Sequence, residues 1–166
     1  MGWRLRAVTA SAARDGGASS NWKRERNPMD DCVFCKIIAG QIPAAVVYRD
    51  ETVMAFMSLQ QLTEGHTLVI PIRHFRNIYE LPDDLAGPLL SAAARIARAI
   101  KREFKPDGMW VSQFNEPAAG QSVFHFHIHV IPRYLNDAAL KGFRLPEPSD
   151  MATLQALAAR VQAGLA

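Results

Sequence analysis

Residues 124–130, FHFHIHV, alternate apolar and histidine side chains without interruption. Because successive side chains of a β-strand point to opposite faces of the sheet, this pattern separates the segment into two rows. The apolar row suits a protein core and consists of Phe124, Phe126, Ile128 and Val130. The other row consists of His125, His127 and His129. The alternation therefore predicts a sheet with one face in the core and three histidines on the other face.

The remaining sequence predicts four more strands and three helices. Short apolar segments rich in β-branched residues and bounded by turn residues indicate strands, which are expected at 45–50, 52–59, 66–71, 108–115 and, with the histidines, 122–134. Apolar residues recur at helical spacing over 85–104 and predict a long amphipathic helix. Shorter helices are expected at 32–40 and 150–165, the second with Ser149 or Asp150 as its N-cap. This order predicts an α+β domain on a five-stranded antiparallel sheet.

Length and charge predict one globular domain with an N-terminal extension. Residues 1–28 have no sustained apolar period and are expected to be disordered or loosely structured, whereas 29–135 form the domain. A C-terminal loop and helix, 136–166, are expected to pack on that domain. The first 28 residues hold six Lys or Arg and two acids, so most of the formal charge of +3 lies there. The remaining charges are nearly balanced, so composition does not predict specific nucleic acid binding. No apolar run is long enough to span a membrane.

The histidine row predicts phosphate chemistry when it is taken with the loop before it. Residues 117–122, PAAGQS, are small, and such a loop can turn backbone N–H groups toward an anion, to which Ser122 adds a hydroxyl. A neutral histidine is a good nucleophile toward phosphorus, provided that its other ring nitrogen carries the proton and donates it to a partner. His127 is flanked on both sides and suits this role. A neighbouring histidine would polarise or protonate the leaving group.

The chain resembles the histidine triad (HIT) family, in particular its Hint/Fhit-like nucleotide hydrolases. The resemblance is carried by HFHIHVI at 125–131, by AGQSV before it and IPRY after it, by GHTLVIPIRH at 65–74, and by CVFCKIIAGQIPAAVVYRDETVMAFM at 32–57. It implies the HIT fold and hydrolysis at the α-phosphorus of purine nucleotide conjugates, with adenosine phosphoramidates and dinucleoside polyphosphates as candidate substrates. It also implies a homodimer with a sheet that continues across the two-fold axis.

The resemblance also implies roles for individual residues. His127 would form a covalent nucleotidyl-histidine, and His129 would lie beside the atom that bridges to the leaving group. His66 would be a partner near the nucleophile, behind the reacting residues. Contacts to the nucleotide are implied for Asn115, Gly120, Gln121, Ser122, Ser58 and Leu59. The sequence departs from the family pattern at Ser58, where Asp is usual, and in the spacing of Asn115 from Gln121, which is one residue short. A serine cannot make the charge-assisted bidentate contact of a carboxylate with ribose.

Cys32 and Cys35 allow three interpretations. They can be two small core residues, a redox pair or two metal ligands; a thioredoxin-like context for the redox pair is absent. Closed zinc sites commonly combine two thiolates with two imidazoles. The resemblance to bacterial HIT proteins implies a structural zinc ion held by Cys32, Cys35, His74 and His125. Two cysteines are too few for a disulfide scaffold, so a reducing, cytoplasmic location is expected.

Two other functions fit the sequence. The three histidines could instead hold a catalytic metal ion, although the PAAGQS loop would then have no evident task. A nucleotide-binding regulatory protein with little turnover is the third hypothesis, to which Ser58 lends weight.

Overall fold

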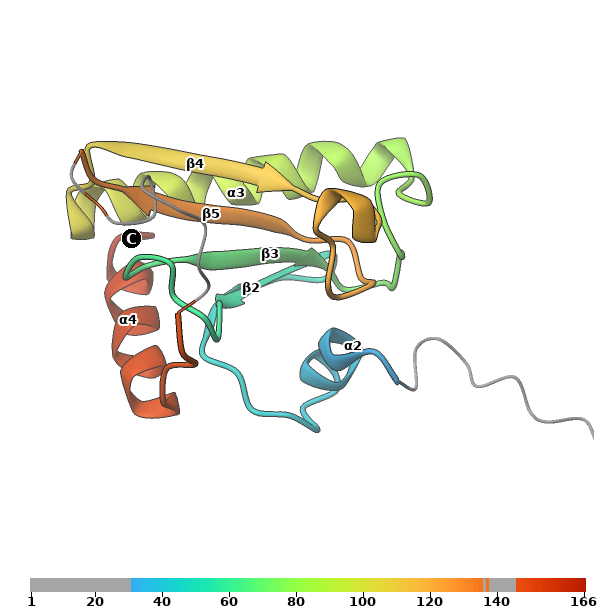
Figure 1. Cartoon of the computed structure of the whole chain (residues 1–166), viewed down its shortest axis with the longest axis horizontal. Helices are drawn as coiled ribbons and strands as arrows, with labels where there is room; N and C mark the ends of the chain where they lie inside the picture. Colours follow the sequence, from blue (N-terminus) through green and yellow to red (C-terminus); the bar gives the residue numbers. More distant parts are fainter. Residues whose placement is uncertain (1–30, 136, 138–145) are drawn as a thin grey trace, which may run out of the picture.

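The computed structural model describes residues 31–135, 137 and 146–166, which form one antiparallel sheet with helices on both faces (Figure 1). The strands lie in the order β1-β2-β3-β5-β4. Their bounds are β1 (Val46–Arg49), β2 (Val53–Met57), β3 (Thr67–Pro71), β4 (Gly108–Gln113) and β5 (Ile128–Arg133). The helices are α2 (Val33–Ile38), α3 (Asp83–Phe104) and α4 (Met151–Ala163), with a short 3-10 turn, η1 (Pro117–Ala119). The predicted α+β domain with a five-stranded antiparallel sheet is confirmed.

Helices α3 and α4 cover one face of the sheet and enclose the main core. The buried side of α3 repeats at helical spacing, as predicted, and consists of Leu89, Ala92, Ala93, Ile96, Ala99 and Ile100. Acidic residues in its first turn and basic residues in its last turn complement the helix dipole. Helix α4 begins after Asp150, whose carboxylate accepts a hydrogen bond from the Thr153 N–H at 2.8 Å, so the predicted cap is confirmed.

Helix α2 covers part of the opposite face and forms a second, smaller core. Phe34 packs there against the outward side chains of β2 and β3, namely Met54, Phe56, Leu68 and Ile70. The rings of Phe34 and Phe56 meet edge to face with centroids 5.4 Å apart. Strand β2 is therefore buried on both faces, which explains why its sequence is apolar throughout.

Strand β5 is shorter than predicted, and this changes the surroundings of the histidines. It begins at Ile128 rather than at 122, because the backbone before it bends and the Phe126 N–H donates to the Phe75 carbonyl instead of to a neighbouring strand. Three residues of the predicted apolar row, Phe126, Ile128 and Val130, lie in the main core as expected. Phe124 does not join them. It is half-buried beneath the guanidinium of Arg76, 4.1 Å from the ring centroid.

The predictions for residues 1–28 and for most of the loop after 135 fall on 1–30, 136 and 138–145, outside the described residues. No helix in the part of the chain that the structure describes is long and apolar enough to cross a membrane.

Candidate active site and metal site

His127 is held in the tautomer that leaves one ring nitrogen free for attack. Its Nδ1 lies 2.6 Å from the backbone carbonyl oxygen of His125, so Nδ1 carries the proton and donates it. Nε2 is then unprotonated. The side chain is almost fully buried, and this burial lowers the pKa of His127, which keeps the ring neutral near pH 7. A protonated Nδ1 with an unprotonated Nε2 is the tautomer that a nucleophilic histidine needs.

His129 is oriented by a relay through His66. Nδ1 of His66 lies 3.1 Å from the Gln60 carbonyl oxygen and must donate to it, so the other nitrogen of His66 is an acceptor. That nitrogen lies 2.9 Å from Nδ1 of His129, which therefore donates and leaves its own Nε2 unprotonated. Burial, followed by the neighbouring His127 ring, lowers the pKa of His129 to about 3. Burial lowers the pKa of His66 to about 4. The predicted supporting position of His66 is thus matched by a direct contact.

Both histidines open into a cavity of about 590 Å³ on the α2 side of the sheet. Their ring centroids lie 4.9 Å apart. Toward β2 and β3 the wall is apolar and includes Phe34, Ile37, Ile42, Phe56, Leu59 and Leu68. Toward β4 and β5 it includes Trp110, Ser112, Phe114 and Ile131. The histidines therefore lie between two halves of one cavity, and Gly120 and Ser122 line it beside them.

The loop before the histidines differs from the expected anion loop. Three of its backbone N–H groups bond within the loop: Ala119 and Gln121 donate to the Glu116 carbonyl, and Gly120 donates to the Pro117 carbonyl. Gly120 adopts a φ of 90°, which L side chains rarely adopt. Only the end of the loop, at Ser122, faces the cavity with a hydroxyl. The phosphate contact expected of Ser122 stays a prediction.

Gln121 and Asn115 brace this loop with their side chains. The Gln121 amide accepts from the Glu116 N–H at 2.8 Å and donates to the Arg76 carbonyl at 2.7 Å. Asn115 accepts from the Ile78 N–H at 2.8 Å and pairs with Gln113. Neither side chain is among those that line the cavity in the described part of the chain. Their predicted nucleotide contacts stay predictions, which would require these bonds to rearrange.

Ser58 and Leu59 line the cavity at the end of β2. The Ser58 hydroxyl donates to the Gln60 carbonyl at 3.0 Å, so it offers only lone pairs to a ligand. Leu59 is 54% exposed. Both stand where a nucleoside in the apolar half of the cavity would contact them, and these contacts stay predictions.

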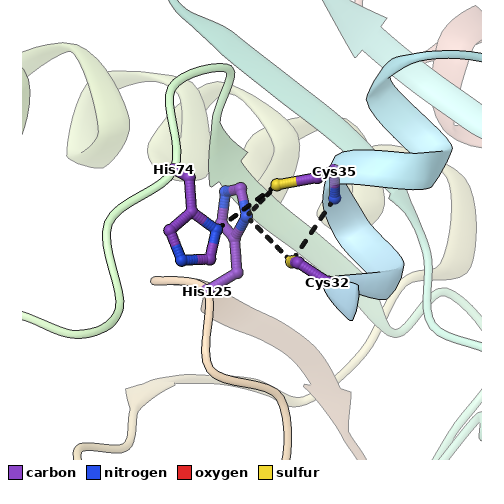
Figure 2. Close-up of side chains that lie close together, drawn as sticks. All are labelled: Cys32, Cys35, His74 and His125. Atoms are coloured by element: carbon purple, nitrogen blue, oxygen red, sulfur yellow. Dashed lines mark hydrogen bonds between the residues drawn. The ribbon is translucent and has the colours of Figure 1, made fainter. Parts of the chain in front are cut away.

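The two cysteines and two of the histidines converge on one point next to this cavity (Figure 2). Cys32 and Cys35 come from the start of α2, His74 from the segment after β3 and His125 from the segment before β5. Sγ of Cys32 lies 3.5 Å from Nδ1 of His125, and Sγ of Cys35 lies 3.3 Å from Nδ1 of His74. The four ligand atoms all lie within 4.8 Å of one another. The predicted convergence of these side chains is confirmed.

The cluster fits a tetrahedral zinc ion. Zinc bonds of about 2.3 Å to sulfur and about 2.0–2.1 Å to nitrogen place neighbouring ligand atoms roughly 3.3–3.8 Å apart. Nε2 of His125 lies 3.0 Å from the Pro71 carbonyl oxygen and donates to it, which leaves Nδ1 free to bind a metal. Without a metal, burial and the adjacent Cys32 raise the pKa of Cys35 to about 12. A cation would remove the cost of placing two thiolates side by side.

His125 belongs to both sites. Its ring joins the cysteine cluster, whereas its backbone carbonyl accepts the hydrogen bond from Nδ1–H of His127. Phe34 contacts both rings, with centroids 5.8 Å from His125 and 5.3 Å from His127. The histidines do not converge as a set of three, so the geometry gives no support to a catalytic metal on His125, His127 and His129. The sequence analysis did not predict the position of Phe34, which lies between Cys32 and Cys35.

Comparison with known proteins identifies the family. The HIT domain matches residues 39–136, and the chain belongs to the HIT domain family. The protein hit of Bacillus subtilis is 55% identical over 105 residues, which are 63% of this chain and 72% of that protein. A crystal structure of a zinc-bound histidine triad family protein from Mycobacterium smegmatis superposes with a TM-score of 0.73 at 33% identity, covering 82% of this chain and 94% of that one. The adenylylsulfatase HINT3 of Arabidopsis thaliana is 36% identical over 122 residues, 73% of this chain and 62% of that protein.

Proposed function

We propose that the protein is a nucleotide hydrolase that cleaves at the α-phosphorus of purine nucleotide conjugates through a nucleotidyl-His127 intermediate. The observation that carries the proposal is the bond from His127 Nδ1 to the His125 carbonyl, because it fixes an unprotonated Nε2 at the cavity. A nucleoside would lie in the apolar half of the cavity beside Phe34, and Ser122 would bind the phosphate. Adenosine phosphoramidates and dinucleoside polyphosphates are the candidate substrates.

The reaction runs in two steps. In the first, Nε2 of His127 bonds to phosphorus as the bond from phosphorus to the leaving group breaks. In the second, water attacks the nucleotidyl-histidine and the bond to Nε2 breaks. In the first step the leaving group takes up a proton that comes from solvent by way of Nε2 of His129. In the second, the hydroxyl group of the water stays on phosphorus and its other proton returns to solvent by the same nitrogen, so one water is consumed over both steps. His129 is placed to carry these protons, because its Nδ1 is engaged by His66 and its Nε2 is free.

The family supports this chemistry. HIT domain membership supports a nucleotide-binding hydrolase in general, and one relative is named an adenylylsulfatase, which implies cleavage beside a nucleotide phosphate in that protein. The candidate substrates of this chain are those that the family resemblance implies.

We further propose a structural zinc ion bound by Cys32, Cys35, His74 and His125. The ligand geometry and the zinc-bound relative from Mycobacterium smegmatis support it. Zinc there would fasten α2 to the segment that carries the histidines, and it would take no part in the reaction. Light scattering and cell fractionation would test the two remaining proposals, a homodimer that pairs through the β4 edge and a cytoplasmic location.

A hydrolysis screen tests the proposed function. Adenosine phosphoramidate, adenosine 5′-phosphosulfate and diadenosine triphosphate would be incubated with the zinc-loaded protein, with and without EDTA. The proposal expects AMP to be released from at least one of them, expects EDTA not to abolish the reaction at once, and expects His127→Ala to be inactive. Turnover by His127→Ala at the normal rate would overturn it. Prompt and complete loss in EDTA, restored by metal, would favour catalysis by a metal ion.

A further inference from the structure

The described residues build an uncharged wall around the cavity that holds the histidines. Among the described residues, none that lines it is Asp, Glu, Lys or Arg. Two arginines outside the lining set each form an ion pair with an acid, although Nε and Nη1 of Arg133 have no hydrogen-bond partner among the described residues. Arg133, beside the ring of Trp110, is bound to Asp137, and Arg76, near the phosphate loop, is bound to Glu116. A ligand in this cavity therefore meets no cation on the described residues that line it, so nothing in that wall would offset a second or third negative charge.

The neutral donors are also few. The N–H groups of Ala119, Gly120 and Gln121 are used within the loop, which leaves the end of the loop around Ser122 to bind a phosphate. These groups suffice for the oxygens of one phosphoryl group. A second phosphate or a sulfate would enter the cavity without donors of its own, and an unpaired buried anion is costly.

The half of the cavity on the β4 side is neutral and largely apolar. Trp110, Ser112 and Phe114 line the cavity, whereas their neighbours Val111 and Gln113 do not, so this row of β4 faces the histidines. Register supports the placement, because Ser112 is paired with His129 and Trp110 with Ile131 across the two strands. The proposed function puts the nucleoside in the opposite half, beside Phe34 and Phe56. The leaving group then falls to the β4 side.

We propose that Trp110, Phe114 and Ile131 form a leaving-group subsite, which accepts an uncharged, partly apolar group and discriminates against a negatively charged one. The proposal rests on the proposed function and narrows its substrates to nucleotides whose single negative charge lies on the phosphorus that is attacked. Ser112 adds a neutral hydroxyl, whose oxygen has no hydrogen-bond partner among the described residues. Polyphosphate and sulfate leaving groups are disfavoured because the subsite offers them neither a free cation nor enough donors.

A matched pair of substrates isolates the charge of the leaving group. Adenosine 5′-phosphoramidates of n-butylamine and of 4-aminobutyrate contain the same P–N bond and an alkyl chain of similar length, but the second adds a carboxylate. The expected result is a kcat/KM at least about tenfold higher for the butylamine compound, because the carboxylate loses part of its hydration against Trp110, which is 38% exposed, and gains no partner in return. Equal values, or a preference for aminobutyrate, would overturn the proposal.

Two lysine substitutions test the location of the subsite. Trp110→Lys places a cation in the subsite and is expected to raise the aminobutyrate-to-butylamine ratio of kcat/KM by about tenfold. Val111→Lys places the same charge one residue along β4, on a side chain that is 46% exposed and does not line the cavity, and should change the ratio less than about twofold. Because β4 is also the proposed dimer edge, the two ratios are compared between variants that have the same mass by light scattering. Equal shifts in both variants would show a long-range charge effect and contradict the assignment to Trp110.

Binding to His127→Ala separates this proposal from the proposed function. Calorimetry with the two phosphoramidates measures the subsite without turnover, and the butylamine compound should bind more tightly by about tenfold. If the wild type cleaves neither compound but this order is found, the subsite stands and the hydrolase proposal fails. If the wild type cleaves both and the order is absent from both binding and turnover, the subsite is wrong and the hydrolase proposal stands.

Discussion

Replacing His66 by leucine should slow turnover by removing the partner that orients His129. The side chain is 2% exposed, and leucine has a similar volume, so the fold should survive. The variant removes the acceptor for Nδ1–H of His129, a contact of 2.9 Å. His129 would then lose the constraint that fixes its tautomer and directs Nε2 to the cavity.

The size of the effect follows from this one bond. Leaving a buried donor without its partner costs about 1–3 kcal/mol. If that cost falls on the transition state, kcat should drop by about 5- to 150-fold, because each 1.36 kcal/mol is a factor of ten. KM should change little, since the lost contact is not with the substrate.

Steady-state kinetics at pH 7 with an adenosine phosphoramidate would measure both constants. His66→Gln is the matched control, because its amide oxygen can accept the same proton, and it should recover part of the lost kcat. The reasoning would be refuted by a folded His66→Leu protein with normal kcat. Equal losses in the leucine and glutamine variants would also refute it, since the bond would then not be the cause.

Further predictions concern the metal, the pH and the assembly. Cys35→Ser should reduce bound zinc from one ion per chain to almost none, by elemental analysis, and lower Tm by at least about 5 °C; unchanged zinc content would contradict the cluster. The free energy of unfolding should fall as the pH drops from about 6.5 toward 4, by up to about 1.4 kcal/mol per pH unit for each buried ring. Folding lowers the pKa of His66 to about 4 and that of His129 to about 3. The unfolded chain therefore binds these protons at a higher pH than the folded chain does. Denaturant titrations at several pH values should show that the unfolding free energy depends less on pH in His66→Leu. An identical dependence would contradict the low pKa of His66. Light scattering at micromolar concentration should give the mass of a dimer, and a stable, active monomer would refute pairing through β4.

Much of the fold could be predicted from local sequence patterns. The apolar spacing of 85–104 predicted α3 to within two residues of its start, and the strands up to β4 were each found within a few residues. These elements follow from periodicity, which directly reflects the side that is buried. Asp150 was one of two predicted caps for α4, and its side chain makes the capping bond.

Alternation failed where tertiary contacts set the backbone. The pattern predicted a strand from 122, but His125 turns its ring to the cysteines and Phe126 bonds to Phe75, so the regular strand starts at Ile128. Such contacts join segments that are far apart in the chain, and periodicity carries no information about them. The cluster of Cys32, Cys35, His74 and His125 was expected only because the family resemblance brought these four residues together.

The inward bonding of the phosphate loop was also beyond sequence reasoning. Small residues allow many backbone conformations, and the sequence could not say which N–H groups would face the cavity. The structure turns three of them inward and uses Gln121 as a brace. Phe34 was missed because a residue between two cysteines reads as part of the cysteine motif, although it forms the wall between the two sites.

Trapping the covalent intermediate tests directly whether His127 is the nucleophile. The zinc-loaded protein would be mixed with excess adenosine phosphoramidate, quenched within milliseconds in alkali, and analysed by intact and peptide mass spectrometry. An acid-labile adduct of one AMP group per chain is expected on the peptide that contains His127; it should decay at the rate of turnover and be absent from His127→Ala. Turnover without any adduct, or an adduct on another residue that persists in His127→Ala, would contradict it.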